Sequence, residues 1–105
     1  MRKIKAIVKR PDERYGHVTN ISDTLKNLQK TVGGWIETVT ITQGVVMIVN
    51  EEGKLLDLPF NIFINQDPIV GTLIVVGADG DEFCDCPISM KAWKECLRVW
   101  GNLDE

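Results

Sequence analysis

The sequence is poor in several residue types on which functional sites depend. It has one histidine, three cysteines and few aromatic residues, which make up 7% of the chain. No apolar run approaches the ~20 residues that a membrane-spanning helix needs. The basic start at residues 1–10 holds few apolar residues and no cleavage site follows it, so we expect no signal peptide. An odd cysteine count without an export signal predicts reduced thiols in a cytoplasm.

The chain also lacks a strong charge of either sign. Its formal net charge is -3, with 26% charged and 44% hydrophobic residues. Nonspecific nucleic-acid binding needs clustered cations, so we expect no nucleic-acid partner, and no membrane partner either. A length of 105 residues predicts a single domain over residues 1–105, with a core that needs neither disulfides nor metals.

The few metal-binding and nucleophilic residues do not form a recognisable constellation. Cys84 and Cys86 would share one face of a strand, but a structural zinc site needs four ligands. Only Cys96 and His17 remain, and both are distant in sequence. A cysteine nucleophile with His17 as its base would lack an identifiable third group. We therefore predict no metal and no cofactor.

Two segments have the apolar spacing and the end signals of helices. In residues 22–34, Ser22 or Asp23 can cap the start, and Gly33 or Gly34 can end the helix in a left-handed conformation. This glycine pair follows a helix, which is the reverse of the order in a phosphate-binding loop. In residues 88–101, Ser89 can cap the start. The apolar stripes of the two helices are Leu25, Leu28 and Val32, and then Trp93, Cys96, Leu97 and Trp100.

Alternating or continuous apolar residues predict the strands. They are Lys3–Lys9, a short segment at His17–Ile21, Trp35–Thr42, Val45–Asn50, Lys54–Leu58 and Ile69–Gly77, with residues 82–86 pairing back. The turn at residues 50–53 would place Gly53 in the left-handed conformation and close a hairpin, while residues 61–68 would be a connection. The predicted fold is α+β, with a mostly antiparallel sheet of about five short strands and two helices in the order β-α-β-β-β-β-(β)-α.

Several of these segments together resemble a known family. The matching residues are Gln29, Val32–Glu37, Asn50–Lys54, Leu58, Pro59, Asn61, Asp67, Ile69 and Gly71. Their order and spacing resemble the family catalogued as domain of unknown function 3846, over roughly residues 20–100. The chain departs from the family pattern in a longer N-terminal strand and loop, in Ile62 where Arg or Lys is common, and in the Cys-Asp-Cys stretch. The resemblance implies an origin in a phage or another mobile element, and it implies no reaction.

Glutamates are the first candidates for chemistry. Glu51 and Glu52 are adjacent at the predicted turn, where neighbouring side chains usually diverge into water. Glu37 shares a strand face with Trp35 and Val39, so it is either part of a site or a charge that protects a sheet edge from pairing.

The asparagines Asn50 and Asn61 are the second candidates, because they bracket the segment that carries the clearest family motif. Their amides either bond the backbone of the turn or face a ligand between the two segments. We name Trp35, Glu37, Asn50 and Asn61 as the predicted binding residues.

The predicted function is an accessory module from a phage or mobile element. It would be non-enzymatic and cytoplasmic, and it would bind a host protein or a small molecule. The alternative is a small enzyme acting on a nucleotide-like substrate, with Glu37 and Glu51 in acid/base roles and Asn61 positioning the substrate. An open sheet edge or the tryptophan-bearing helix also offers a surface for a homodimer.

Overall fold

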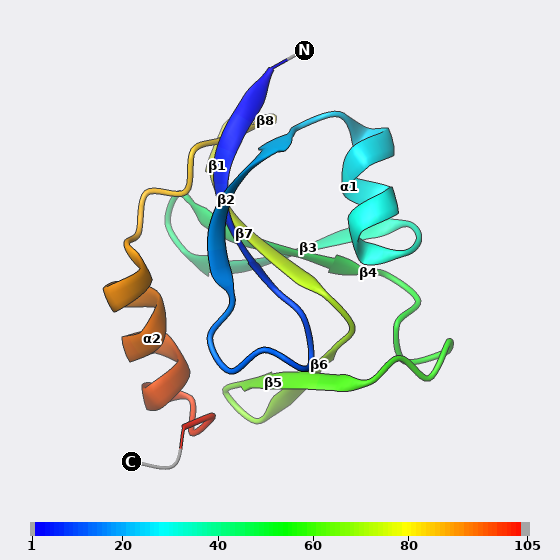
Figure 1. Ribbon diagram of the computed structural model, residues 1–105, viewed down its shortest axis with the longest axis vertical. Coiled ribbons are helices and arrows are strands. Elements are labelled where there is room, and N and C mark those ends of the chain that lie inside the picture. The colour runs from blue at the N-terminus through cyan, green and yellow to red at the C-terminus, as the bar shows by residue number, and fades with distance from the viewer. Residues whose placement is uncertain (1, 104–105) are drawn as a thin grey trace.

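The computed structural model describes residues 2–103. In chain order they form β1 (Lys3–Lys9), β2 (His17–Ser22), α1 (Leu25–Val32), β3 (Ile36–Thr42), β4 (Val45–Asn50), β5 (Phe60–Ile64), β6 (Asp67–Val70), β7 (Leu73–Asp79), β8 (Glu82–Cys84) and α2 (Met90–Val99). Within these residues neither helix is long and apolar enough to cross a membrane. The predicted α+β class with an antiparallel sheet is confirmed (Figure 1).

One antiparallel sheet organises the molecule. Its strand order is β2-β1-β7-β4-β3, and β8 pairs with the end of β7. Strands β5 and β6 form a separate two-stranded hairpin. The described residues thus contain more strands than the roughly five that the sequence predicts. Strands β2 and β3 each pair with one neighbour in the sheet and lie at its edges.

Each face of the sheet is covered by one helix (Figure 1). Alternate residues of a strand point to opposite faces, so the central strands, apolar on both faces, supply two cores. One core packs Met47 and Val75 with Trp93 and Leu97 of α2. The other packs Ile48, Ile74 and Val76 with Leu28 and Val32 of α1. The apolar stripes predicted for the two helices are therefore confirmed, except that Leu25 is 55% exposed.

The helix ends follow the predicted capping chemistry, with one correction. Ser89 caps α2 as predicted, and Gly33 ends α1 with a φ of 84°. The cap of α1 is Thr24, whose hydroxyl accepts a hydrogen bond from the Asn27 amide at 3.2 Å. The predicted caps Ser22 and Asp23 are wrong because Ser22 is the last residue of β2 and Asp23 forms an ion pair with Arg2 at 3.3 Å.

The predicted strand at Lys54–Leu58 is wrong. Strand β4 pairs with β3 on one side and β7 on the other, so neither of its edges is open to a returning strand. The segment instead folds into consecutive turns, with the Leu56 amide 2.9 Å from the Glu52 carbonyl and the Leu58 amide 3.0 Å from the Gly53 carbonyl.

The predicted left-handed conformation of Gly53 is wrong. Asp57 is the residue of this segment that adopts a left-handed conformation, with a φ of 55°. Gly53 is instead required by packing, because a Cβ atom there would lie 2.8 Å from Val70 Cγ2.

The predicted connection at residues 61–68 is also wrong. It forms β5 and the start of β6, joined by a tight turn in which Asn65 and Gln66 have φ values of 47° and 74°. The predicted strand Ile69–Gly77 is two strands, because the chain turns at Gly71 with a φ of 76°. The Gly71 amide donates to the Pro59 carbonyl at 2.7 Å, which closes the open end of the β5–β6 hairpin.

Candidate functional site

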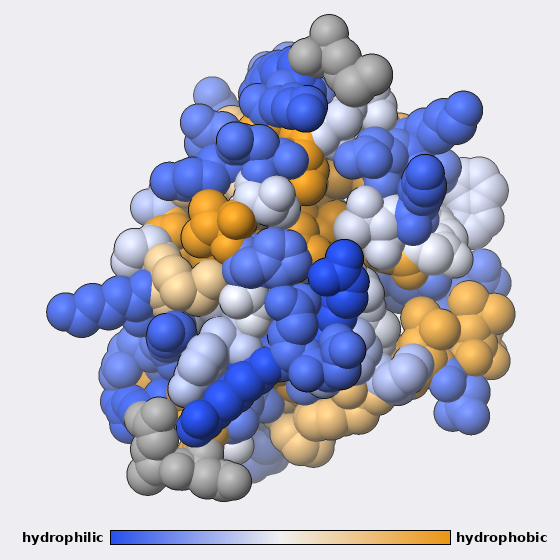
Figure 2. Space-filling view, in the orientation of Figure 1, coloured by the Kyte–Doolittle hydropathy of each residue, from blue (hydrophilic) through white to orange (hydrophobic). Residues whose placement is uncertain are grey.

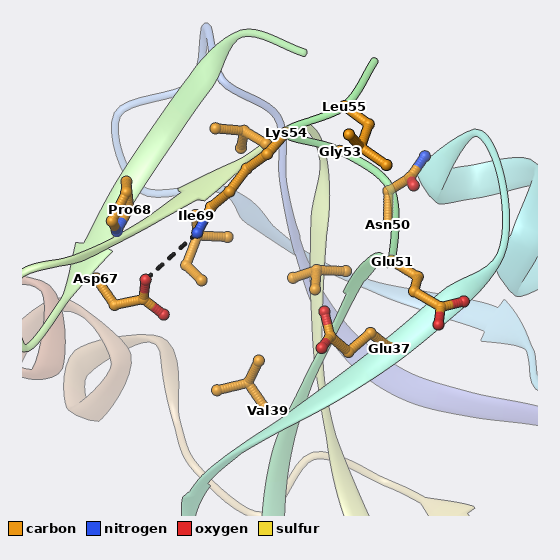
Figure 3. A pocket seen from close by; sticks show the side chains of 12 residues that line it. Glu37, Val39, Asn50, Glu51, Gly53, Lys54, Leu55, Asp67, Pro68 and Ile69 are labelled. Atoms are coloured by element: carbon orange, nitrogen blue, oxygen red, sulfur yellow. Dashed lines mark hydrogen bonds and ion pairs between the residues drawn. The ribbon is translucent and has the colours of Figure 1, made fainter. Parts of the chain in front are cut away.

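A pocket of about 310 Å³ opens between the β3–β4 face of the sheet, the loop after β4, and β6 (Figure 3). Its lining is Glu37, Val39, Val49, Asn50, Glu51, Gly53, Lys54, Leu55, Asp67, Pro68, Ile69 and Val70. We call it the acidic pocket. It joins the family segment around residues 50–54 to the one around residues 67–71, which the sheet alone does not bring together.

The floor of the acidic pocket is apolar. Val49 and Ile69 are buried, and Val39 packs against the same core. These side chains come from β4, β6 and β3, and they are fixed by the packing beneath α2. Such a floor can contact the methylene stem of an amphipathic group while a polar head reaches the rim.

The rim of the pocket carries an excess of negative charge. Its charged groups are the carboxylates of Glu37, Glu51 and Asp67 and the ammonium group of Lys54. Lys54 Nζ lies 3.5 Å from Asp67 Oδ1, and both side chains are more than 60% exposed. Such an exposed pair contributes little to stability, and the rim still has two more negative than positive groups.

The carboxylates of Glu37 and Glu51 do not converge. In Figure 3 the Glu37 carboxylate extends across the hollow on the side of Asp67, whereas the Glu51 side chain extends away from Asp67. General acid/base catalysis by two carboxylates requires both to face one substrate. The geometry therefore favours Glu37 and Asp67, not Glu37 and Glu51, as the groups facing a common ligand.

Asn50 lines the pocket, but its amide is used inside the protein. It is 5% exposed, and its Nδ2 donates to the Val32 carbonyl at 3.1 Å. Its Oδ1 accepts from the Glu52 amide at 2.8 Å. The side chain thus ties the end of α1 to the turn after β4, and Figure 3 shows the amide pointing toward the helix. A Cβ atom on Gly34 would lie 3.0 Å from Nδ2, which explains why a small residue precedes Trp35.

Asn61 lies outside the acidic pocket, and its amide is also used inside the protein. Its Nδ2 donates to the Lys9 carbonyl at 2.9 Å and to the Gly71 carbonyl at 2.8 Å, while its Oδ1 accepts from Lys9 Nζ. Lys9 is 3% exposed. Burial lowers the pKa of Lys9, and the carboxylates of Glu13 and Asp12 partly oppose that shift. This bond network joins β1, β5 and the turn before β7, and it commits both amide hydrogens and the oxygen of the buried Asn61 side chain to internal bonds.

Trp35 lies beside the acidic pocket. It is 63% exposed and lines a shallow hollow of about 460 Å³ with Glu51, Glu52 and Leu55. Of the four predicted binding residues, Glu37 and Asn50 therefore line the pocket, Trp35 flanks it and Asn61 lies elsewhere. Sequence reasoning missed Lys54 and Asp67 as rim residues, although both belong to the family motif that could have indicated them.

The cysteines are free thiols, and the single histidine is paired with a carboxylate. Within residues 2–103, no group of three or more His, Cys, Asp or Glu side chains could hold a metal ion. All three cysteines are free thiols, and burial raises the pKa of Cys86, as it does that of Cys96. His17 Nδ1 instead lies 2.9 Å from Glu13 Oε2.

Comparisons with known proteins identify a family. The family model described as Domain of unknown function (DUF3846) matches residues 4–98. The matched range includes the first strand, which the sequence resemblance at residues 20–100 left out. Neither the curated proteins nor the solved structures gave a significant match.

Proposed function

The chain belongs to the DUF3846 family, and on that premise we propose that it is a non-enzymatic binding module whose acidic pocket takes a positively charged group. The observation that supports this proposal is an apolar floor beneath three carboxylates and a single, paired ammonium group. Carboxylates bind ammonium and guanidinium groups through charge-assisted hydrogen bonds. The ligand would be a small amine or guanidine, or a lysine or arginine side chain of a host protein.

The biological setting remains the one that the sequence predicts. The module would serve a phage or another mobile element in the cytoplasm of its host. A pocket rimmed by carboxylates repels phosphate groups, which supports the expectation that nucleic acid is not its partner. The edge strands β2 and β3 each have one neighbour in the sheet, so the outer edge of each strand is not paired with another strand of the described residues. We expect any homodimer to form through strand pairing at one of these two outer edges.

N-acetyl-arginine amide is the probe that tests the proposal. We expect it to shift the NMR signals of Val39 and Ile69 with a Kd on the order of 1 mM, from about 0.3 kcal/mol per heavy atom. Glu37→Gln and Asp67→Asn should each weaken binding by roughly threefold, as expected for partly solvated charge pairs. Lys54→Met should strengthen it, because this change removes the competing cation from Asp67.

Glu82→Gln is the matched control, since Glu82 is a 77% exposed glutamate outside the pocket. It should leave the affinity unchanged. Equal binding of N-acetyl-glutamine amide, or equal affinities in the Glu37 and Asp67 variants and the unaltered protein, would rule out recognition of charge by this pocket.

The alternative, a small enzyme for a nucleotide-like substrate, is favoured by one observation: Glu37 and Glu51 line the same pocket. The rim charge and the divergence of the two side chains argue against it. If the protein turned over a nucleotide, with product followed by chromatography, and Glu37→Gln abolished that turnover, the enzyme would replace the binding module as the assigned function.

A further inference from the structure

An exposed apolar patch adjoins the acidic pocket. Trp35 is 63% exposed and Leu55 84%, and both line the shallow hollow that also includes Glu51 and Glu52. We call Trp35 and Leu55 the apolar patch. Leu56, the next residue in the loop, is 56% exposed. Figure 2 shows hydrophobic side chains gathered at the surface over the loop between β4 and β5. Exposed apolar side chains that gather beside polar groups offer a contact surface for a partner.

The patch and the pocket form one continuous surface. Glu51 and Leu55 line both hollows. The combined surface offers an apolar contact at one end and a carboxylate-rimmed pocket at the other. Its charged groups are four carboxylates, from Glu37, Glu51, Glu52 and Asp67, against the one ammonium group of Lys54.

This surface is held in place by backbone hydrogen bonds. The Glu51 amide donates to the Trp35 carbonyl at 2.8 Å, which fixes the start of β3 against the loop. Within the loop, the Leu56 amide donates to the Glu52 carbonyl at 2.9 Å and the Asp57 amide to the Lys54 carbonyl at 3.2 Å. A partner would therefore meet a preformed surface and need order little of it on binding.

We propose that the acidic pocket and the apolar patch together bind a basic peptide segment of a partner protein. An arginine or lysine side chain enters the pocket, and a large apolar side chain a few residues away covers Trp35 and Leu55. The inference rests on the proposed function of the pocket and extends it, because a small amine would fill the pocket alone. Charge complementarity selects a basic partner, and the same carboxylates oppose docking on an anionic lipid surface.

Fluorescein-labelled, acetylated octapeptides test the inference. The background is alanine and glycine, and each test peptide carries one arginine and one leucine separated by zero to four residues. Control peptides carry only the arginine or only the leucine. Fluorescence polarisation should show that the best-spaced peptide binds at least about fivefold more tightly than the arginine-only peptide, as partial burial of one leucine side chain predicts.

Variants of the protein test whether the affinity gained from the leucine comes from contact with the apolar patch. Trp35→Ser should reduce the affinity for the best-spaced peptide to that for the arginine-only peptide, whose own affinity should not change because Trp35 does not line the acidic pocket. Leu55→Ser should also weaken binding of the best-spaced peptide. Leu25→Ser is the matched control because Leu25 is a leucine of α1 that is 55% exposed, and it should have no effect. Circular dichroism of each variant checks that the fold is retained.

The outcomes separate the inference from the proposed function. If the arginine-only peptide binds through Glu37 and leucine adds nothing at any spacing, the pocket stands and the peptide inference fails. If no arginine peptide binds at millimolar protein, both fail. Sedimentation velocity showing a dimer that Leu55→Ser dissociates would assign the patch to a second copy of the chain and overturn the peptide inference.

Discussion

At the residue scale, the buried Asn61 side chain makes three internal hydrogen bonds. Two backbone carbonyls and the Lys9 ammonium group all depend on it, and no buried side-chain nitrogen or oxygen in residues 2–103 lacks a partner. Buried polar networks of this kind are costly when one member is removed, because the others are left desolvated and unpaired.

Asn61→Ala should therefore lower the free energy of unfolding by about 3 kcal/mol, the range for breaking a buried bond to a charged group. Urea denaturation measures the loss. Asn20→Ala, at an exposed asparagine of β2, is the control and should change stability by less than about 0.5 kcal/mol. If Asn61→Ala lowered the free energy of unfolding no more than the control does, Lys9 and the two carbonyl groups would have found water or other partners.

Asn50 and Gly34 form a second pair that can be tested. Gly34→Ala would bring a Cβ atom to 3.0 Å from Nδ2 of Asn50, whose side chain is held in place by one hydrogen bond from Nδ2 and one to Oδ1. We expect Gly34→Ala to destabilise the protein by about 1–2 kcal/mol through this contact. In the Asn50→Ala background most of that cost should disappear, giving a coupling energy of at least about 0.5 kcal/mol in a double-mutant cycle. If the stability changes of Gly34→Ala and Asn50→Ala were additive, the cost of Gly34→Ala would not come from contact with Asn50.

At the scale of elements, the loop between β1 and β2 is organised by one carboxylate. Glu13 Oε1 accepts from the Arg10 amide at 2.9 Å, and Oε2 lies 2.9 Å from His17 Nδ1. Burial alone would raise the pKa of Glu13, but the hydrogen bonds from Arg10 and His17 and their charges lower it below its usual 4.5. The loop also carries Tyr15, whose carbonyl accepts from Trp93 Nε1 at 2.8 Å and so connects the loop to α2.

A lowered pKa in the folded state sets the direction of the pH dependence. Glu13 contributes stability above pH 4.5, the pKa of its unfolded form, and this contribution is lost as the pH falls through the lower folded pKa. Glu13→Gln should therefore reduce the loss of stability on acidification, by less than about 1 kcal/mol for a partly solvated group. Urea midpoints between about pH 6 and pH 2 measure the difference. Asp81→Asn, in the exposed turn before β8, is the control and should not alter the profile.

The β4–β5 loop and the β5–β6 hairpin are the elements that make the site. The loop places Lys54 and Leu55 beside the sheet, and the hairpin brings Asp67 opposite Glu37 (Figure 3). Gly53 permits this approach because any Cβ atom there would meet Val70. The acidic pocket is therefore a product of how the hairpin packs against the loop.

At the scale of the whole molecule, two cores share a single sheet. Leu28 belongs to the core under α1 and Leu97 to the core under α2, and both are almost fully buried. Because the central strands contribute side chains to both cores, neither core can unfold while the other keeps its sheet. The molecule should behave as one cooperative unit.

Leu28→Ala and Leu97→Ala test this cooperativity. Each should lower the free energy of unfolding by about 2–5 kcal/mol, the usual cost of truncating a buried leucine. Tryptophan fluorescence, which reports mainly on the α2 side, and far-ultraviolet circular dichroism should still give coincident urea transitions in both variants. Separate transitions for the two signals would show that one helix can leave the sheet independently.

The sequence by itself determined the elements whose signals are local. The apolar period indicated the two helices, with Gly33 at the end of α1 and Ser89 at the start of α2, and continuous apolar runs indicated the central strands, because each of these signals acts within a few residues. The order of polar residues around Asn50 and Asp67 was enough to indicate the family.

Only the tertiary structure decided what the motif residues do. Whether Asn50 and Asn61 face a ligand or the backbone depends on which carbonyl groups lie beside them. Asn50 bonds the Val32 carbonyl, and Asn61 bonds the carbonyls of Lys9 and Gly71. These partners lie at least ten residues away in the sequence. The strand predicted at Lys54–Leu58 failed for the same reason: both edges of β4 were already taken by β3 and β7. Partners distant in sequence settle such questions, because a hydrogen bond or an ion pair needs contact in space and leaves no periodic trace in the chain.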